Sequence, residues 1–229
     1  MLSSKIKKLQ YEPIGLVEGI SRNLMHAILN GVLKGGEQLI EAELQEIFSV
    51  SKSPVREALR DLESKGLVEI RPRKGAFVKP ITRADIVENY KVRAVLEALA
   101  VREAYEKMGE DDFEKMKATL DKMVVSAKNK KYREYFDYDH EFHKIYLDAC
   151  QNTLLIKLVR RLRIHNLWYN FDHEYYKRNF DLAEDVKPHV KLVEALQNKK
   201  ITGKKIEEMM REMIEKALQN FLYYVSDKT

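Results

Sequence analysis

The residues that interrupt helices are distributed very unevenly along this chain of 229 residues. Seven of the nine glycines lie within residues 1–75, and four of the five prolines lie within residues 1–80. From Ile81 onward the sequence is almost free of such residues, with single breakers only where one helix can give way to the next. This distribution predicts a turn-rich N-terminal part and a helical C-terminal part, divided within residues 78–84.

Three helices are predicted in the N-terminal part. The first two show apolar residues at helical spacing, over residues 16–28 and 41–48. The third lies in the segment SVSKSPVREALRDLESKGLVEI. There, Ser53 is a candidate N-cap, Pro54 a candidate first helical residue, and Gly66 the end of the helix.

A β-hairpin is predicted directly after the third helix. Two strand-like runs, LVEI and GAFVK, flank the basic turn RPRKG. The predicted fold is therefore mainly α: a winged helix-turn-helix of three helices plus a β-hairpin, joined to an all-α antiparallel helical bundle. We expect the first domain to span residues 1–80 and the second to span residues 83–226.

The distribution of charge favours DNA as a partner of the first domain. Residues 51–80 contain eight lysines and arginines against four acids, and such a local excess is typical of a phosphate-binding surface. Arg56 and Arg60 lie one turn apart on the third helix, away from its apolar face. Arginine is the commonest reader of guanine, because its fork matches the O6 and N7 atoms. The alternative is a solvent-exposed helix whose arginines pair with nearby acids: Glu57, Asp61 or Glu63.

Composition sets broader limits. The chain is 45% hydrophobic and 34% charged, with a net charge of +5, which predicts a globular protein rather than a disordered one. No apolar run approaches the ~18 residues needed to span a membrane. The N-terminus lacks the apolar core of a secretory signal, and the single Cys150 has no internal disulfide partner. We therefore expect a cytoplasmic protein without a membrane partner.

The N-terminal part of the sequence resembles a known family. ILNGVLKGGEQLIEAELQEIFSVSKSPVREALRDLESKGLVEI is similar to the DNA-binding domain of GntR-family transcription regulators, over roughly residues 14–80. Two positions depart from the usual pattern: Lys52 replaces an arginine, and Ala42 occupies a site where some members carry a DNA-contacting arginine. The resemblance implies DNA contacts from the third helix and the wing, namely Ser51, Lys52, Ser53, Arg56, Arg60, Arg71, Arg73, Lys74 and Gly75.

The second part resembles the all-helical FCD domain of the FadR subfamily. The segments that carry this resemblance are ENYKVRAVLEALAVREA, DHEFHKIYLDACQN and PHVKLVEAL. In many such domains an Asp, a His four residues later and two further histidines hold a metal, and a small carboxylate effector binds beside it. The resemblance therefore implies a divalent transition metal such as zinc or nickel.

The residues themselves support part of that site. Asp139 and His143 fall on the apolar stripe of their predicted helix, and His189 lies among valines and leucines on another. Inward-facing polar groups need partners, and carboxylate with imidazole suits a transition metal. The alternative is an Asp–His hydrogen bond within a helical core.

Two further positions complete the predicted site. A fourth ligand would fall near residues 211–212, where the chain has Arg211 and Glu212, so Glu212 is the only candidate there. Arg93 lies among apolar residues and is a candidate for binding the effector carboxylate. Its alternative is an ion pair with Glu97, one turn further along the helix.

We therefore expect a homodimeric repressor that binds a palindromic double-stranded operator and responds to a small organic acid. One alternative is a metal-free, FadR-like regulator that binds a larger ligand such as an acyl thioester. A more distant alternative is a metal-dependent hydrolase that uses Asp139, His143 and His189, although no second group supplies a base or nucleophile. We expect a regulator, not an enzyme.

Overall fold

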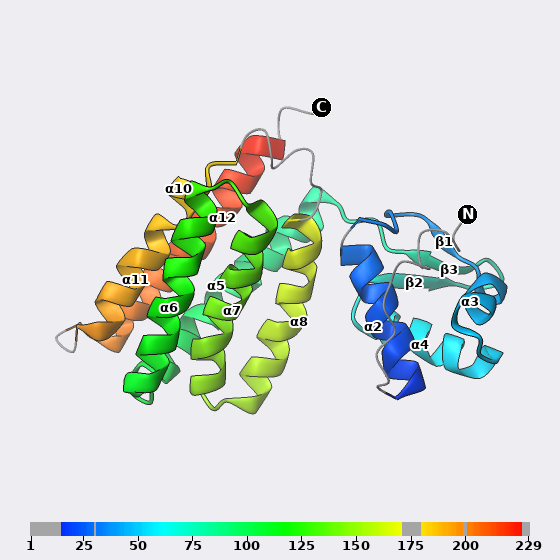
Figure 1. Cartoon of the computed structure of the whole chain (residues 1–229), viewed down its shortest axis with the longest axis horizontal. Helices are drawn as coiled ribbons and strands as arrows, with labels where there is room; N and C mark the ends of the chain where they lie inside the picture. The colour runs from blue at the N-terminus through cyan, green and yellow to red at the C-terminus, as the bar shows by residue number, and fades with distance from the viewer. Residues whose placement is uncertain (1–14, 30, 171–179, 199–200, 226–229) are drawn as a thin grey trace. The chain divides into compact units, whose positions relative to one another are not determined.

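The computed structural model of the chain describes residues 15–29, 31–170, 180–198 and 201–225. The chain forms two compact units, and the boundary between them falls at Arg83 and Ala84 (Figure 1). The fold class is confirmed: a small winged helix-turn-helix unit comes first, and a unit made entirely of helices follows.

The first unit contains three helices and three short strands among its described residues. Its helices are α2 (Leu16–Leu29), α3 (Glu41–Phe48) and α4 (Lys52–Ser64). Its strands are β1 (Gln38–Leu39), β2 (Val68–Arg71) and β3 (Gly75–Val78), and they form an antiparallel sheet in the order β1-β3-β2. In Figure 1, β2 and β3 form the hairpin that follows α4.

The sheet has one strand more than the sequence predicted. Gln38 pairs with Phe77 and Leu39 pairs with Ala76, so β1 adds an edge to the predicted hairpin. A strand of two residues shows no alternation that a sequence pattern could reveal. Leu39 is nevertheless buried, and its contribution to the core explains why this part of the turn-rich segment is held against β3.

The start of α4 also differs from the prediction. The helix begins at Lys52 with Ser51 as its N-cap, two residues earlier than the predicted Ser53. Pro54 is therefore the third helical residue, where its missing N–H still costs no intrahelical bond. The Ser53 hydroxyl instead lies 3.2 Å from a carboxylate oxygen of Glu57.

A single core holds the helices of the first unit to the sheet. Its members come from every element of the unit and are at most 2% exposed, and they include Ile20, Leu24, Ile28, Leu33, Leu39, Leu44, Val55, Leu59, Leu62, Leu67 and Val78. Each such side chain stabilises the fold by about 1.5–3 kcal/mol through burial. The apolar face of α4 is therefore fixed inward, and its opposite face is left to solvent.

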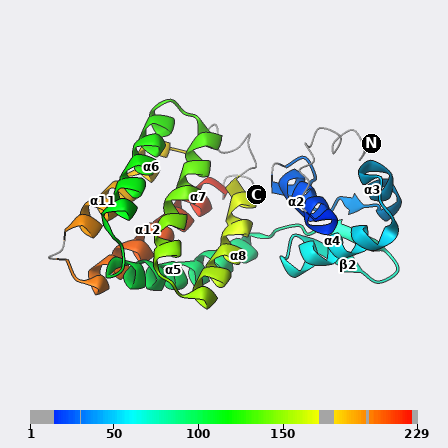
Figure 2. The same ribbon diagram turned by 60° about the horizontal axis from the view of Figure 1, so that its bottom comes forward.

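The second unit is a bundle of long helices. They are α5 (Arg83–Tyr105), α6 (Glu110–Lys128), α7 (Tyr132–Ala149), α8 (Thr153–Asn170), α10 (Leu182–Asp185), α11 (Lys187–Gln197) and α12 (Gly203–Val225). Helices α6 and α7 lie side by side, and α11 packs against α6 and α12. Figure 2 shows α5 running past α7 and α8, an arrangement that brings polar residues of these helices together.

The structure also bears on the expectations about membrane-spanning segments and about Cys150. In the described part of the chain, no helix is long and apolar enough to cross a membrane. Cys150 is a buried free thiol, and burial raises its pKa.

Candidate functional site

The N-terminal end of α4 presents a row of exposed polar side chains. Ser51, Lys52, Ser53 and Arg56 are all exposed. Four residues of the same helix, Val55, Ala58, Leu59 and Leu62, are buried against the rest of the unit. The burial of one face thus turns the predicted DNA-contacting residues outward together, as a helix that enters a major groove requires.

Arg56 does not pair with the acids of its own helix. Its Nε donates to both carboxylate oxygens of Glu41, at 3.0 Å each, and Lys52 Nζ lies 3.8 Å from the same carboxylate. Glu41 is the first residue of α3, so the contact joins the two helices of the helix-turn-helix. Arg60 is also exposed and makes no ion pair with any described residue.

The wing is shaped by its backbone as much as by its charges. Arg73 and Gly75 both have positive φ, 61° and 97°, which turns the chain sharply between β2 and β3. Arg73, Lys74 and Gly75 are exposed at this turn. Arg71 pairs with Glu69 at 3.1 Å, and its guanidinium lies 4.6 Å from the centroid of the Phe77 ring. The tip of the wing is therefore available to a phosphate, while Arg71 is already held by neighbours.

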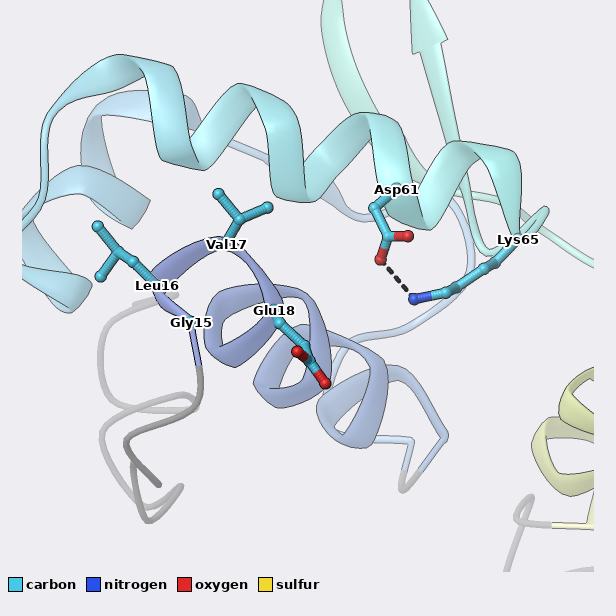
Figure 3. Close-up of a pocket in the computed structure, with 6 residues that line it drawn as sticks. All are labelled: Gly15, Leu16, Val17, Glu18, Asp61 and Lys65. Atoms are coloured by element: carbon cyan, nitrogen blue, oxygen red, sulfur yellow. Dashed lines mark hydrogen bonds and ion pairs between the residues drawn. The ribbon is translucent and has the colours of Figure 1, made fainter.

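A separate depression of about 630 Å³ lies between the start of α2 and the end of α4. Figure 3 shows Asp61 of α4 and Lys65, the C-cap of that helix, facing this depression and joined by an ion pair, with Glu18 of α2 nearby. Asp61 also accepts a hydrogen bond from Ser21. The polar groups on its α4 side are thus satisfied within the fold, and Ser51, Lys52 and Ser53 lie at the opposite end of the helix.

In the second unit, three of the four candidate metal ligands come together. Asp139 and His143 of α7 and His189 of α11 offer ligand atoms that all lie within 4.8 Å of one another. Asp139 Oδ1 is 3.1 Å from His189 Nε2 and 3.4 Å from His143 Nε2. Two ligands bound about 2.0–2.1 Å from a tetrahedral zinc lie about 3.3 Å apart, so this spacing fits a metal.

The second nitrogen of each imidazole supports the same interpretation. His143 Nδ1 lies 2.6 Å from Glu97, and His189 Nδ1 lies 3.2 Å from the backbone oxygen of Asp185. When each Nδ1 carries the proton, each Nε2 only accepts, and so does Asp139 Oδ1. Three acceptors that face one another need a proton or a cation between them, and metal-binding histidines are held in this way.

Arg163 is a member of the site that sequence reasoning missed. Its guanidinium bonds Asp139 Oδ2 at 3.0 Å and both carboxylate oxygens of Glu97, at 3.3 and 3.2 Å. It is 3% exposed, although its helix shows no clear apolar stripe that would have marked it as buried. Only the packing of α8 against α5 and α7 reveals its role.

The pKa values follow from these contacts. Burial would raise the pKa of Asp139, but His143, His189 and Arg163 lower it well below its usual range. Burial would likewise raise the pKa of Glu97, yet Arg93 and Arg163 hold it well below the ordinary value. Burial would lower the pKa of His189, but Asp139 raises it overall. The neighbouring cationic groups thus favour the ionised form of both carboxylates.

Arg93 forms the ion pair that the sequence left open as an alternative. Its Nε donates to Glu97, and the side chain is 4% exposed. However, Arg93 Nη1 and Arg163 Nε are buried and have no hydrogen-bond partner among the described residues. Two guanidinium groups thus retain unused donors beside the candidate metal ligands, and the effector role of Arg93 stays a prediction.

The fourth candidate ligand is not part of this cluster. Glu212 of α12 is exposed, and among the described residues the group that could hold a metal contains only Asp139, His143 and His189. The apolar face of α12 points inward through Met210, Met213 and Ile214, which leaves Glu212 on the solvent side. Among the residues that the structure describes, the site therefore offers three protein ligands.

Comparisons with known proteins identify the family of each of the two units. A family model described as "FCD domain" matches residues 88–216, and one described as "Bacterial regulatory proteins, gntR family" matches residues 16–78. The transcriptional regulator YdhC of Bacillus subtilis is 32% identical over 61% of this chain and 62% of its own length. The transcriptional repressor RspR of Escherichia coli is 27% identical over 67% of this chain and 69% of its own.

A solved structure shows the same fold. McbR/YncC of E. coli superposes with a TM-score of 0.74 at 21% identity, covering 94% of this chain and all of that one.

The match with YdhC spans less than two thirds of that relative's length. The matching families and relatives are transcription regulators and not enzymes, which removes the hydrolase alternative. The chain belongs to the GntR family of bacterial regulatory proteins and carries an FCD domain.

Proposed function

We propose that this GntR-family regulator is a repressor that binds a specific double-stranded operator and releases it when a small carboxylate binds the FCD domain. The observation that carries the proposal is the exposed N-terminal end of α4, where Ser51, Lys52, Ser53 and Arg56 are turned outward next to a basic wing. We propose that Arg56 contacts a base edge, and that Arg60 and the wing residues contact phosphate.

The assembly in this proposal is a homodimer that binds a palindromic operator in the cytoplasm. Two copies of α4 related by a two-fold axis would read two half-sites one helical turn apart. The winged helix-turn-helix of residues 1–80 would bind DNA, and the bundle of residues 83–226 would bind the effector and dimerise.

The test of DNA recognition is Arg56→Ala. We expect this change to weaken binding to an operator selected from random duplexes by ~1–3 kcal/mol and to relax the preference at one base pair. Fluorescence anisotropy with operator and single-substituted duplexes measures both effects. Arg161→Ala, which removes an exposed arginine of α8, serves as the control and should leave the affinity unchanged. An unchanged base preference in Arg56→Ala would refute the recognition role of α4.

We propose that the FCD domain binds a divalent transition metal such as zinc or nickel through Asp139, His143 and His189. The distances between their facing atoms and the hydrogen bonds at each Nδ1 support this proposal. A bound metal would supply a Lewis acid that accepts an oxygen of the effector carboxylate. The chain's own groups would hold the rest of that anion, through the unused donors of Arg93 and Arg163.

Metal binding is tested by elemental analysis and thermal unfolding. Protein purified without added metal should contain about one zinc or nickel per chain, and chelation should lower the melting temperature of the FCD domain. His189→Ala should lose the metal, whereas Glu212→Ala should keep it because Glu212 is exposed and outside the cluster. A metal-free protein that co-purifies with an acyl thioester would favour the FadR-like alternative instead.

A further inference from the structure

We infer that Glu41 is a specificity-determining residue, which orients Arg56 for a base edge. It also lowers the non-specific DNA affinity of the reading surface, by which we mean Ser51, Lys52, Ser53 and Arg56. The inference rests on the proposed function, since it assigns a role at the same DNA-binding surface. Glu41 would not contact DNA bases itself, so its role is that of a positioning residue.

The geometry of the contact leaves the useful edge of Arg56 free. Both carboxylate oxygens of Glu41 accept from Arg56 Nε at 3.0 Å. The two Nη groups of Arg56 make no hydrogen bond with any residue that the structure describes. An arginine that reads guanine end-on uses those two groups for O6 and N7. Glu41 therefore binds Nε of Arg56 and leaves its two Nη groups free to contact the base.

The position of Glu41 in the fold gives it a fixed orientation. It is the first residue of α3, where the positive end of the helix dipole favours a carboxylate. Its side chain is 30% exposed, against 53% for Arg56, so it lies closer to the protein than the side chain that it holds. Half-exposed ion pairs contribute little to folding stability, which indicates that the contact matters for orientation rather than for folding.

The charge of Glu41 has a second consequence. A carboxylate close to the reading surface repels phosphate, and its cost falls on every DNA sequence alike. This uniform cost lowers the affinity for random duplex, and the difference in affinity between operator and random duplex comes from the guanine contact of the oriented Arg56. Specific interfaces commonly contain such a repulsive element in addition to the attractive one. Lys52 Nζ lies 3.8 Å from the same carboxylate, so the negative charge of Glu41 attracts Lys52 as well as Arg56.

The experiment compares affinities for a selected operator and for random-sequence duplex, measured by anisotropy with the full chain at one salt concentration. We expect Glu41→Ala to raise the affinity for random duplex and to lower the ratio of operator to random affinity by about tenfold. Glu41→Gln, which keeps an acceptor for Arg56 Nε, should lower the ratio less. Circular dichroism and thermal melting verify that both variants fold.

The matched control is Glu46→Ala. Glu46 is an exposed acid of the same helix, and it forms no ion pair with any described residue. The Glu46→Ala change removes one negative charge, as Glu41→Ala does, but leaves the contact between Glu41 and Arg56 in place. If Glu46→Ala lowers the ratio as much as Glu41→Ala, net charge alone explains the effect and the inference is wrong.

A double-mutant cycle separates this inference from the proposed function. In the Arg56→Ala background, Glu41→Ala should change the ratio less than about twofold, because the group that it orients is gone. Full additivity of the two changes would overturn the orienting role. If Arg56→Ala lowers the ratio and Glu41→Ala does not, the inference fails while the proposed function stands. If neither change alters the ratio, the recognition role of α4 fails as well.

Discussion

At the scale of the single residue, Glu97 is a buried carboxylate of the second unit that is held by several neighbours. It is fully buried on α5 and accepts hydrogen bonds from Arg93, Arg163 and Tyr146, while His143 Nδ1 lies 2.6 Å away. A buried carboxylate is tolerated only when charges and hydrogen bonds satisfy it. Glu97 therefore links three helices and sets which nitrogen of His143 carries the proton.

The first prediction is that Glu97→Ala destabilises the FCD domain by ~3–5 kcal/mol. The reason is that Arg93 loses the carboxylate it pairs with and is left buried without a counter-charge, while Arg163 keeps only its ion pair with Asp139. Urea unfolding at neutral pH measures the change in free energy. Glu88→Ala removes an exposed acid of the same helix and should change stability by less than about 0.5 kcal/mol. A loss in Glu97→Ala no larger than in this control would show that the cluster is solvated.

At the scale of the element, the end of α4 decides where the wing begins. Gly66 has a φ of 72°, its N–H bonds the carbonyl of Glu63 at 2.8 Å, and the N–H of Leu67 bonds the carbonyl of Leu62 at 3.0 Å. These two bonds form a Schellman motif, which ends a helix and reverses the chain. The reversal leads directly into β2, so the recognition helix and the wing keep a fixed register.

Gly66→Ala should therefore destabilise the winged helix-turn-helix by ~1–2 kcal/mol, because a side chain is disfavoured at positive φ. Chemical denaturation, monitored by circular dichroism, measures this decrease in the free energy of unfolding. Gly15→Ala is the matched control, since its backbone shows no positive φ and a Cβ there would meet nothing within 4 Å. Equal stability of the two variants would contradict the role given to Gly66.

The elements also show what a sequence can and cannot predict. The helices α3 and α4 and the hairpin followed from apolar spacing and from Gly66, because these signals are local. The strand β1 did not follow, since two residues show no period, and its pairing with β3 depends on contacts distant in sequence. Glu41 and Arg163 were missed for the same reason. Their partners lie 15 and 24 or more residues away, and no local pattern encodes such a contact.

At the scale of the whole molecule, the two compact units carry separate chemistry. The proposed DNA contacts all belong to the first unit, whereas Asp139, His143 and His189 belong to the second. Each unit has its own buried core. Regulation therefore requires that ligand binding in one unit alters the free energy of DNA binding by the other, and this coupling must be reciprocal.

The last prediction uses this separation. Units with independent cores unfold in separate steps, so calorimetry of the full chain should resolve two transitions. A ligand stabilises only the unit that binds it, by an amount that grows with its concentration relative to its dissociation constant. Added zinc or nickel should raise one transition temperature, and a selected operator duplex should raise the other. His189→Ala should abolish the shift caused by metal and retain the shift caused by DNA, while Arg56→Ala should reduce the shift caused by DNA and retain the shift caused by metal. A single transition that both ligands raise equally would show one cooperative unit and contradict the division of roles.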